Sequence, residues 1–136
     1  MTRRPWGSTE TPYEEIGGDP TVRAIADAFY DVIEAESPTL RAMLPDDTAG
    51  SRDKLYQFLS GWTGGPPLYW EQHGHPRLRM RHVPFPIDLA AADEWARCME
   101  KAIESVEMPD DAARFLTDQL SKAALTLVNR QAPPET

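Results

Sequence analysis

Residues 74–87 read Gly-His-Pro-Arg-Leu-Arg-Met-Arg-His-Val-Pro-Phe-Pro-Ile and hold two histidines, three arginines and three prolines. Pro76 can occupy the first turn of a helix, and Pro84 stops that helix soon after His82. Leu78 and His82 are four residues apart, so they share one helical face. The stretch therefore predicts a short, basic helix over 76–82 that carries a histidine beside an apolar residue.

The chain before this stretch alternates apolar helical patterns with proline and glycine stops. Apolar residues recur at three- and four-residue steps, as one face of a helix requires. We expect helices over 12–16, from 19 to just before 37, from 38 to 44, over roughly 51–63 and over 68–73. Asp19 and Ser37, each followed by proline, are expected to cap the second and third helices. The expected inner faces of the second and fourth helices are Val22, Ile25, Ala26, Phe29, Ile33 and Leu55, Phe58, Leu59, Trp62.

Two longer helices are expected after the stretch. Asp88 caps the first, which runs to about residue 106, and Pro109 opens the second, which runs to about residue 129. Their expected inner residues are Ala91, Trp95, Cys98, Met99, Ala102, Val106 and Ala113, Leu116, Leu120, Ala123, Leu127. No alternating strand pattern and no internal repeat is evident, so the fold class is all-α, with short helices that cross.

Composition limits the possible functions. The 136 residues suit one domain, expected over 12–130, with a flexible extension over 1–11 and a polar tail over 131–136. A net charge of −8 argues against binding nucleic acid or an anionic membrane. The single cysteine, Cys98, excludes an intramolecular disulfide and a paired-cysteine zinc site. Without a secretory signal or a long apolar run, we expect a cytoplasmic protein that does not span a membrane.

The three histidines His73, His75 and His82 do not form a multi-histidine zinc motif. A single axial histidine can nevertheless hold haem, because the porphyrin supplies the other four nitrogens. Considered alone, His82 is more often a surface or capping residue, and its arginines are more often a solvated face. Tyr30 and Trp95 alone are more often core residues.

Together, however, several motifs resemble the truncated haemoglobins of group II, from Tyr13 to about Val106. The first motif is Tyr13-Glu14-x-Ile16-Gly17-Gly18, followed by Phe29-Tyr30. The others are Phe58-Leu59-Ser60-Gly61-Trp62-x-Gly64-Gly65-Pro66, then 74–82 with Pro84-Phe85, and Trp95-x-x-Cys98-Met99. The expected last helix also fits the family.

The resemblance implies a shortened globin fold, a two-over-two helical sandwich around haem b (iron protoporphyrin IX). The family's proximal iron ligand falls on His82, and its distal tyrosine and tryptophan fall on Tyr30 and Trp95. The distal gate position falls on Ser51, with Leu55 and Phe58 one and two turns later. Candidate propionate contacts are Lys54, Arg79 and Arg81. Leu44 stands where the family places an aromatic ring against the haem, which implies a smaller distal hydrogen-bond network.

Three functions remain open on the sequence. The first is reversible binding of dioxygen or another diatomic gas. The second is an enzymatic role on the same haem, either nitric oxide dioxygenation or peroxide turnover, with a reductase as partner. The third is a haem-free, globin-like module that acts through protein contacts. The sequence favours no particular oligomeric state.

Overall fold

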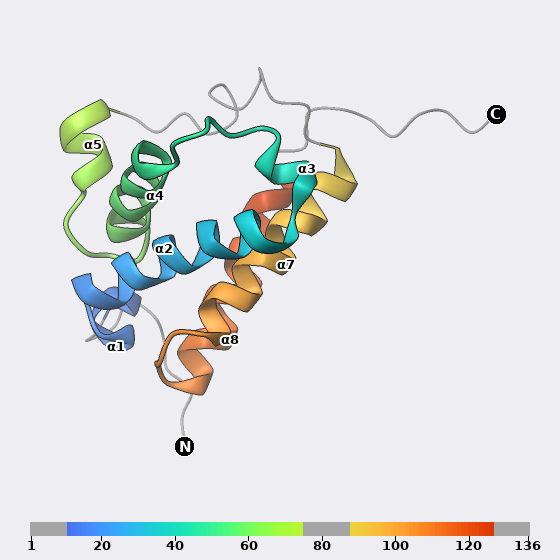
Figure 1. Cartoon of the computed structure of the whole chain (residues 1–136). Helices are drawn as coiled ribbons and strands as arrows, with labels where there is room; N and C mark the ends of the chain where they lie inside the picture. The colour runs from blue at the N-terminus through green and yellow to red at the C-terminus, as the bar shows by residue number, and fades with distance from the viewer. Residues whose placement is uncertain (1–10, 75–87, 127–136) are drawn as a thin grey trace.

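The computed structural model of the chain describes residues 11–74 and 88–126, and every regular element in those ranges is a helix (Figure 1). The helices are α1 (Pro12–Ile16), α2 (Asp19–Glu36), α3 (Pro38–Arg41), α4 (Ala49–Trp62), α5 (Leu68–His73), α7 (Leu89–Glu104) and α8 (Asp110–Leu125). The all-α prediction is confirmed. The expected helix over 76–82, the N-terminal extension up to residue 10 and the C-terminal tail lie outside the described residues.

Two of the three predicted caps are present. The Ser37 hydroxyl accepts from the backbone N–H of Leu40 at 3.3 Å, and the Asp88 carboxylate accepts from that of Ala91 at 2.8 Å. Each bond satisfies a backbone donor that the first turn of a helix leaves unpaired. Short side-chain acceptors before α3 and α7 therefore define where these helices begin.

The predicted cap at Asp19 is wrong. Gly18 is the N-cap residue, with φ +76°, and Asp19 is already the first residue of α2. The Asp19 carboxylate instead accepts a hydrogen bond from the Tyr56 hydroxyl of α4. A partner on another helix has therefore replaced the local capping bond.

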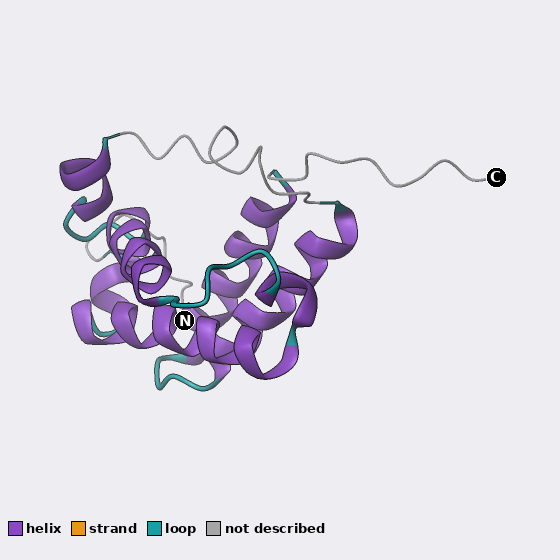
Figure 2. Ribbon diagram, turned by 45° about the horizontal axis from the view of Figure 1, so that its top comes forward, coloured by secondary structure: helices purple, strands orange, loops and turns teal. Residues whose placement is uncertain are grey.

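Helix α2 lies at the centre of the molecule. Figures 1 and 2 show α4 and α5 on one side of it and α7 and α8 on the other. Helix α4 packs on α2 and α5, whereas α7 packs on α2, α3 and α8. The α2 face predicted from the sequence is buried as expected, through Val22, Ile25, Ala26, Phe29 and Ile33. Because α2 packs against both α4 and α7, its residues set the spacing between these two helices.

The inner faces of α7 and α8 differ in part from the prediction. On α7, Trp95 is only half-buried and Val106 lies beyond the helix end, while Ala92 and Ile103 are buried. On α8 the buried residues follow four-residue steps, at Ala112, Leu116, Leu120 and Ala124. Ala113 and Ala123 are half-buried, and Leu127 lies outside the described residues. Alanines lie on both sides of this buried face of α8. The sequence pattern therefore could not decide which of two neighbouring alanines is buried.

The end of α4 is joined to α1 by close backbone packing. The Tyr13 backbone N–H donates to the Thr63 carbonyl at 2.9 Å, and a Cβ added at Gly65 would overlap the Tyr13 ring. Only glycine fits beneath that ring, which explains this part of the glycine motif. In the described ranges, no helix combines the length and the apolar composition needed to cross a membrane.

Candidate functional site

The two sides of α4 have different surroundings. The α2 side, formed by Arg52, Tyr56 and Leu59, packs on α2: Leu59 is buried, and Arg52 and Tyr56 bond to α2 carboxylates. The half-buried side consists of Ser51, Leu55, Phe58 and Trp62, all of intermediate exposure. The sequence pattern predicted one apolar face, with Leu55, Phe58, Leu59 and Trp62 inward, but only Leu59 is buried. Three large apolar side chains on one side of α4 therefore pack against the core without being fully buried, and the Phe58 ring also stacks on that of Trp70, with centroids 6.5 Å apart.

Tyr30 is a half-buried residue of α2 whose hydroxyl is largely shielded from water. Its ring meets Phe29 edge-on, with centroids 5.1 Å apart at 80°. Burial raises the pKa of Tyr30 to about 12, against an opposing effect of the Arg52 charge. No hydroxyl partner exists among the residues described here, so the O–H is a desolvated donor that can serve a ligand.

Trp95 approaches the same place from α7. Its ring packs on Phe29 with centroids 5.1 Å apart and planes tilted by 56°. The buried Phe29 thus contacts both candidate distal residues and brings α2 and α7 together at this point. The indole N–H of Trp95 likewise has no hydrogen-bond partner within 11–74 and 88–126. Two donors from two helices, neither bonded to another described residue, consequently pack on one buried ring.

The remaining candidates lie further out. Leu44 is half-buried and packs against the core after α3. The Arg41 guanidinium holds the turn there by donating to the Pro45 and Asp46 carbonyls, each at 3.0 Å. Lys54 is exposed on α4, beside the half-buried side. His82, Arg79 and Arg81 lie outside the described residues.

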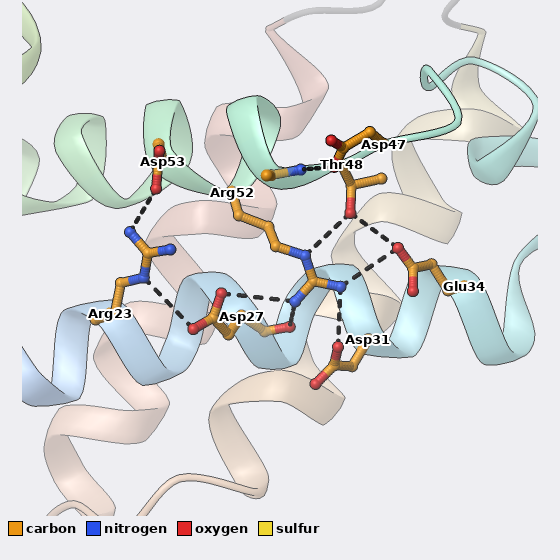
Figure 3. Close-up of polar contacts among 9 residues, drawn as sticks. Arg23, Asp27, Asp31, Glu34, Asp47, Thr48, Arg52 and Asp53 are labelled. Atoms are coloured by element: carbon orange, nitrogen blue, oxygen red, sulfur yellow. Dashed lines mark hydrogen bonds and ion pairs between the residues drawn. The ribbon is translucent and has the colours of Figure 1, made fainter.

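A polar cluster between α2 and α4 was not anticipated from the sequence. Figure 3 shows Arg52 of α4 inserted among three carboxylates of α2, with Thr48 beside it. Those carboxylates belong to Asp27, Asp31 and Glu34, which recur at steps of four and three and so share one helical face. That spacing could have predicted an acidic face on α2, but it could not predict which cationic side chain would bind there.

These residues fit a flat, largely apolar cofactor with a small polar ligand. The half-buried side of α4, together with Tyr30, Trp95 and Leu44, offers large apolar surfaces from the central part of the fold. The Tyr30 and Trp95 donors can meet a gas that acquires negative charge on a metal. Within the described residues, no group of three metal-ligating side chains gathers that could hold an ion. A porphyrin, which brings its own four nitrogens, suits this donor set.

Comparisons with known proteins agree with this fit. A family model described as bacterial-like globin matches residues 11–129. The chain is 41% identical to group 2 truncated hemoglobin YjbI of Bacillus subtilis over 123 residues, which cover 90% of this chain and 92% of that protein. The structure superposes on the group II truncated hemoglobin of Bacillus anthracis with a TM-score of 0.87 and 36% identity, covering 96% of this chain and 97% of that one.

A second solved structure is the truncated oxygen-avid haemoglobin of Bacillus subtilis. Its TM-score is 0.82 at 41% identity, with 88% of this chain and all of that chain covered. Sequence identity and coverage at this level indicate common family membership in addition to a shared fold. The predicted fold class, an all-α truncated globin fold, is confirmed.

Proposed function

The chain belongs to the bacterial-like globin family, among the group II truncated haemoglobins, and we propose that it binds dioxygen reversibly at a haem held by His82. Family membership supports a haem globin that binds gases. The histidine ligand, haem b as the form of the cofactor, and the distal donors are our proposal. When bound, haem supplies the iron at which the gas is held.

On the proximal side, His82 binds the iron through one neutral ring nitrogen. Of the three histidines, it is the one that the family resemblance assigns to the proximal position. His73, by contrast, is exposed on α5, where its ring nitrogen lies 2.9 Å from the Gln57 side-chain oxygen. Arg79, Arg81 and Lys54 pair with the two propionates. His73 therefore serves as a matched control for His82.

On the distal side, Tyr30 and Trp95 donate hydrogen bonds to the gas. The observation that carries the proposal is the packing of Tyr30 of α2 and Trp95 of α7 on one buried ring, Phe29, with neither donor bonded to a residue in 11–74 or 88–126. Ser51, Leu55 and Phe58 line the approach from α4, and the apolar side chains of Leu55 and Phe58 keep water away from the gas. Each donated bond in such a dry site is worth about 1–3 kcal/mol and slows gas escape. Because two such bonds would hold the gas, we propose that this chain binds dioxygen strongly, as its oxygen-avid relative does.

The first experiment tests the cofactor. Wild-type protein produced with ample haem is expected to purify with an intense Soret absorption band. His82→Ala should lose most of the haem, whereas His73→Ala should retain it. A colourless wild-type protein that takes up no haem on titration would refute the proposal and favour the haem-free alternative.

The second experiment tests the distal donors. Tyr30→Phe and Trp95→Phe should each speed dioxygen dissociation, measured by stopped-flow, by roughly five- to 150-fold. Tyr56→Phe is the control, because it removes a hydroxyl from the α2 side of α4. Unchanged rates in both distal variants would disprove the assignment.

A third experiment distinguishes a carrier from a nitric oxide dioxygenase. The oxygenated protein is mixed with nitric oxide in the presence of a reductase. A carrier shows one stoichiometric oxidation and no cycling.

A further inference from the structure

Arg52 is held at the α2–α4 junction by four hydrogen bonds that its guanidinium donates. Its Nε donates to the Thr48 hydroxyl at 3.0 Å, and its Nη1 donates to the Asp27 backbone carbonyl at 3.1 Å. Its Nη2 donates to the Asp31 carboxylate at 2.9 Å and to that of Glu34 at 3.3 Å. The side chain is only 17% exposed. A planar guanidinium bonded in this way has a fixed position and orientation.

The fixed guanidinium lies against the ring of Tyr30. The Arg52 Cζ is 5.9 Å from the Tyr30 ring centroid, within the range of a cation–π interaction. The Tyr30 ring also meets the Phe29 ring edge-on. The positive charge also acts to lower the pKa of Tyr30, against the larger effect of burial. A cation near the phenol polarises its O–H and makes it a stronger hydrogen-bond donor.

We propose that Arg52 is a positioning residue for gas binding: it holds the Tyr30 ring and so directs the hydroxyl that donates to the gas. This inference rests on the proposed function, because it assigns Arg52 a role through Tyr30.

A purely structural role for Arg52 is the competing explanation, and the chain contains a matched control for it. Arg23 of α2 also bridges to α4, through Asp53 at 2.7 Å, and it pairs with Asp27 of its own helix at 3.4 Å. Its Cζ lies 5.3 Å from the ring of Tyr56, which is on the α2 side of α4. Arg23 therefore shares the ion pairs and the cation–π contact but pairs with a tyrosine outside the gas site.

The kinetic test compares the two arginines. Arg52→Gln should speed dioxygen dissociation from the holoprotein about two- to fivefold, the size expected for losing one cation–π contact. Arg23→Gln should leave the rate unchanged. In a Tyr30→Phe background, Arg52→Gln should have no further effect, because the group through which it acts is gone.

A second readout does not depend on gas kinetics. The chain has four tyrosines, so ring NMR signals of tyrosine-labelled, carbon monoxide-saturated holoprotein can be assigned by single Tyr→Phe variants. Arg52→Gln should shift the Tyr30 signal and leave that of Tyr56 in place, and Arg23→Gln should do the reverse. Arg52→Lys keeps a cation without the planar fork and should give smaller changes, which serves if Arg52→Gln does not fold.

Equal effects of Arg52→Gln and Arg23→Gln on dissociation would overturn the inference, as would an Arg52 effect that persists without the Tyr30 hydroxyl. In either case the proposed function would stand, since Tyr30→Phe alone still changes the wild-type rate. If Tyr30→Phe alone has no effect, this inference fails and gas binding with Trp95 as the donor stands. If neither distal variant changes the rate, or the wild-type protein binds no haem, both proposals fail together.

Discussion

The two sides of α4 use the same helix for opposite purposes. The α2 side buries Leu59 and pairs Arg52 and Tyr56 with carboxylates of α2. The half-buried side presents Leu55, Phe58 and Trp62 without full burial. The part of an apolar side chain that the protein core does not bury can instead be buried by a ligand. The residues that stabilise the fold and the residues proposed to contact the ligand thus lie on different sides of the same helix.

That separation means that neighbouring residues in sequence should respond differently to mutation. Leu59 and Phe58 are adjacent, yet they point to different sides of α4. Arg52 and Lys54 are two residues apart, yet only Arg52 contacts α2 carboxylates. Each pair offers a direct test of whether the two sides are functionally distinct.

The largest effect is expected at Leu59. Leu59→Ala removes a buried side chain and leaves a cavity between α4 and α2, which costs about 2–5 kcal/mol of unfolding free energy. Urea unfolding followed by circular dichroism measures this loss. Phe58→Ala should cost less than half as much in the same assay, although it deletes more atoms. Equal losses would show that both sides of α4 are core.

Phe58 should instead matter for retaining the cofactor. Phe58→Ala is expected to speed haem loss to an excess of a scavenging protein by about tenfold, because it removes a ring that the proposed site places against the porphyrin. Leu59→Ala should change the rate less, once both variants are compared below their unfolding transitions. A Phe58 variant that holds haem as firmly as wild type would place the cofactor elsewhere.

The positions of the helices were predictable, because prolines, glycines and short polar caps punctuate this chain. The division of α4 was not. Steps of three and four residues group Leu55, Phe58, Leu59 and Trp62 into one broad face, and periodicity cannot distinguish a buried position from a half-buried one. The surroundings of each residue depend on where α2 and α5 pack.

The polar contacts were harder to predict than the apolar faces. Asp19 precedes a proline and looks like a cap, yet a phenol 37 residues away in sequence binds it. Arg52 lies 18 to 25 residues from its acidic partners and could have been a solvent-exposed charge. The Tyr30 and Trp95 assignments came from family resemblance, and the packing of both rings on Phe29 is new information from the structure.

A smaller effect is expected from charges on the two sides. Arg52→Gln should lower the unfolding free energy by about 1 kcal/mol, since its partners are 39–68% exposed and solvent screens each ion pair. Lys54→Gln should stay within about 0.5 kcal/mol of wild type. Denaturant midpoints of the two variants, measured at low and at high salt, test this. A Lys54 loss as large as that of Arg52 would contradict the distinction.

The smallest effect is expected in the acid limb of the stability profile. The Thr48 hydroxyl, with help from Arg52, lowers the pKa of Glu34 below its ordinary value of 4.5. Because the folded pKa is the lower one, the contribution of Glu34 is present above pH 4.5 and is lost as the pH falls through the folded pKa. Glu34→Gln should therefore flatten the stability profile between about pH 5 and pH 3. The exposed Glu107, changed to Gln, is the control. Parallel profiles for wild type and Glu34→Gln would show that the α2–α4 cluster is too well solvated to link protonation to folding, while a flattening in Glu34→Gln alone would assign that linkage to the α2 side of α4.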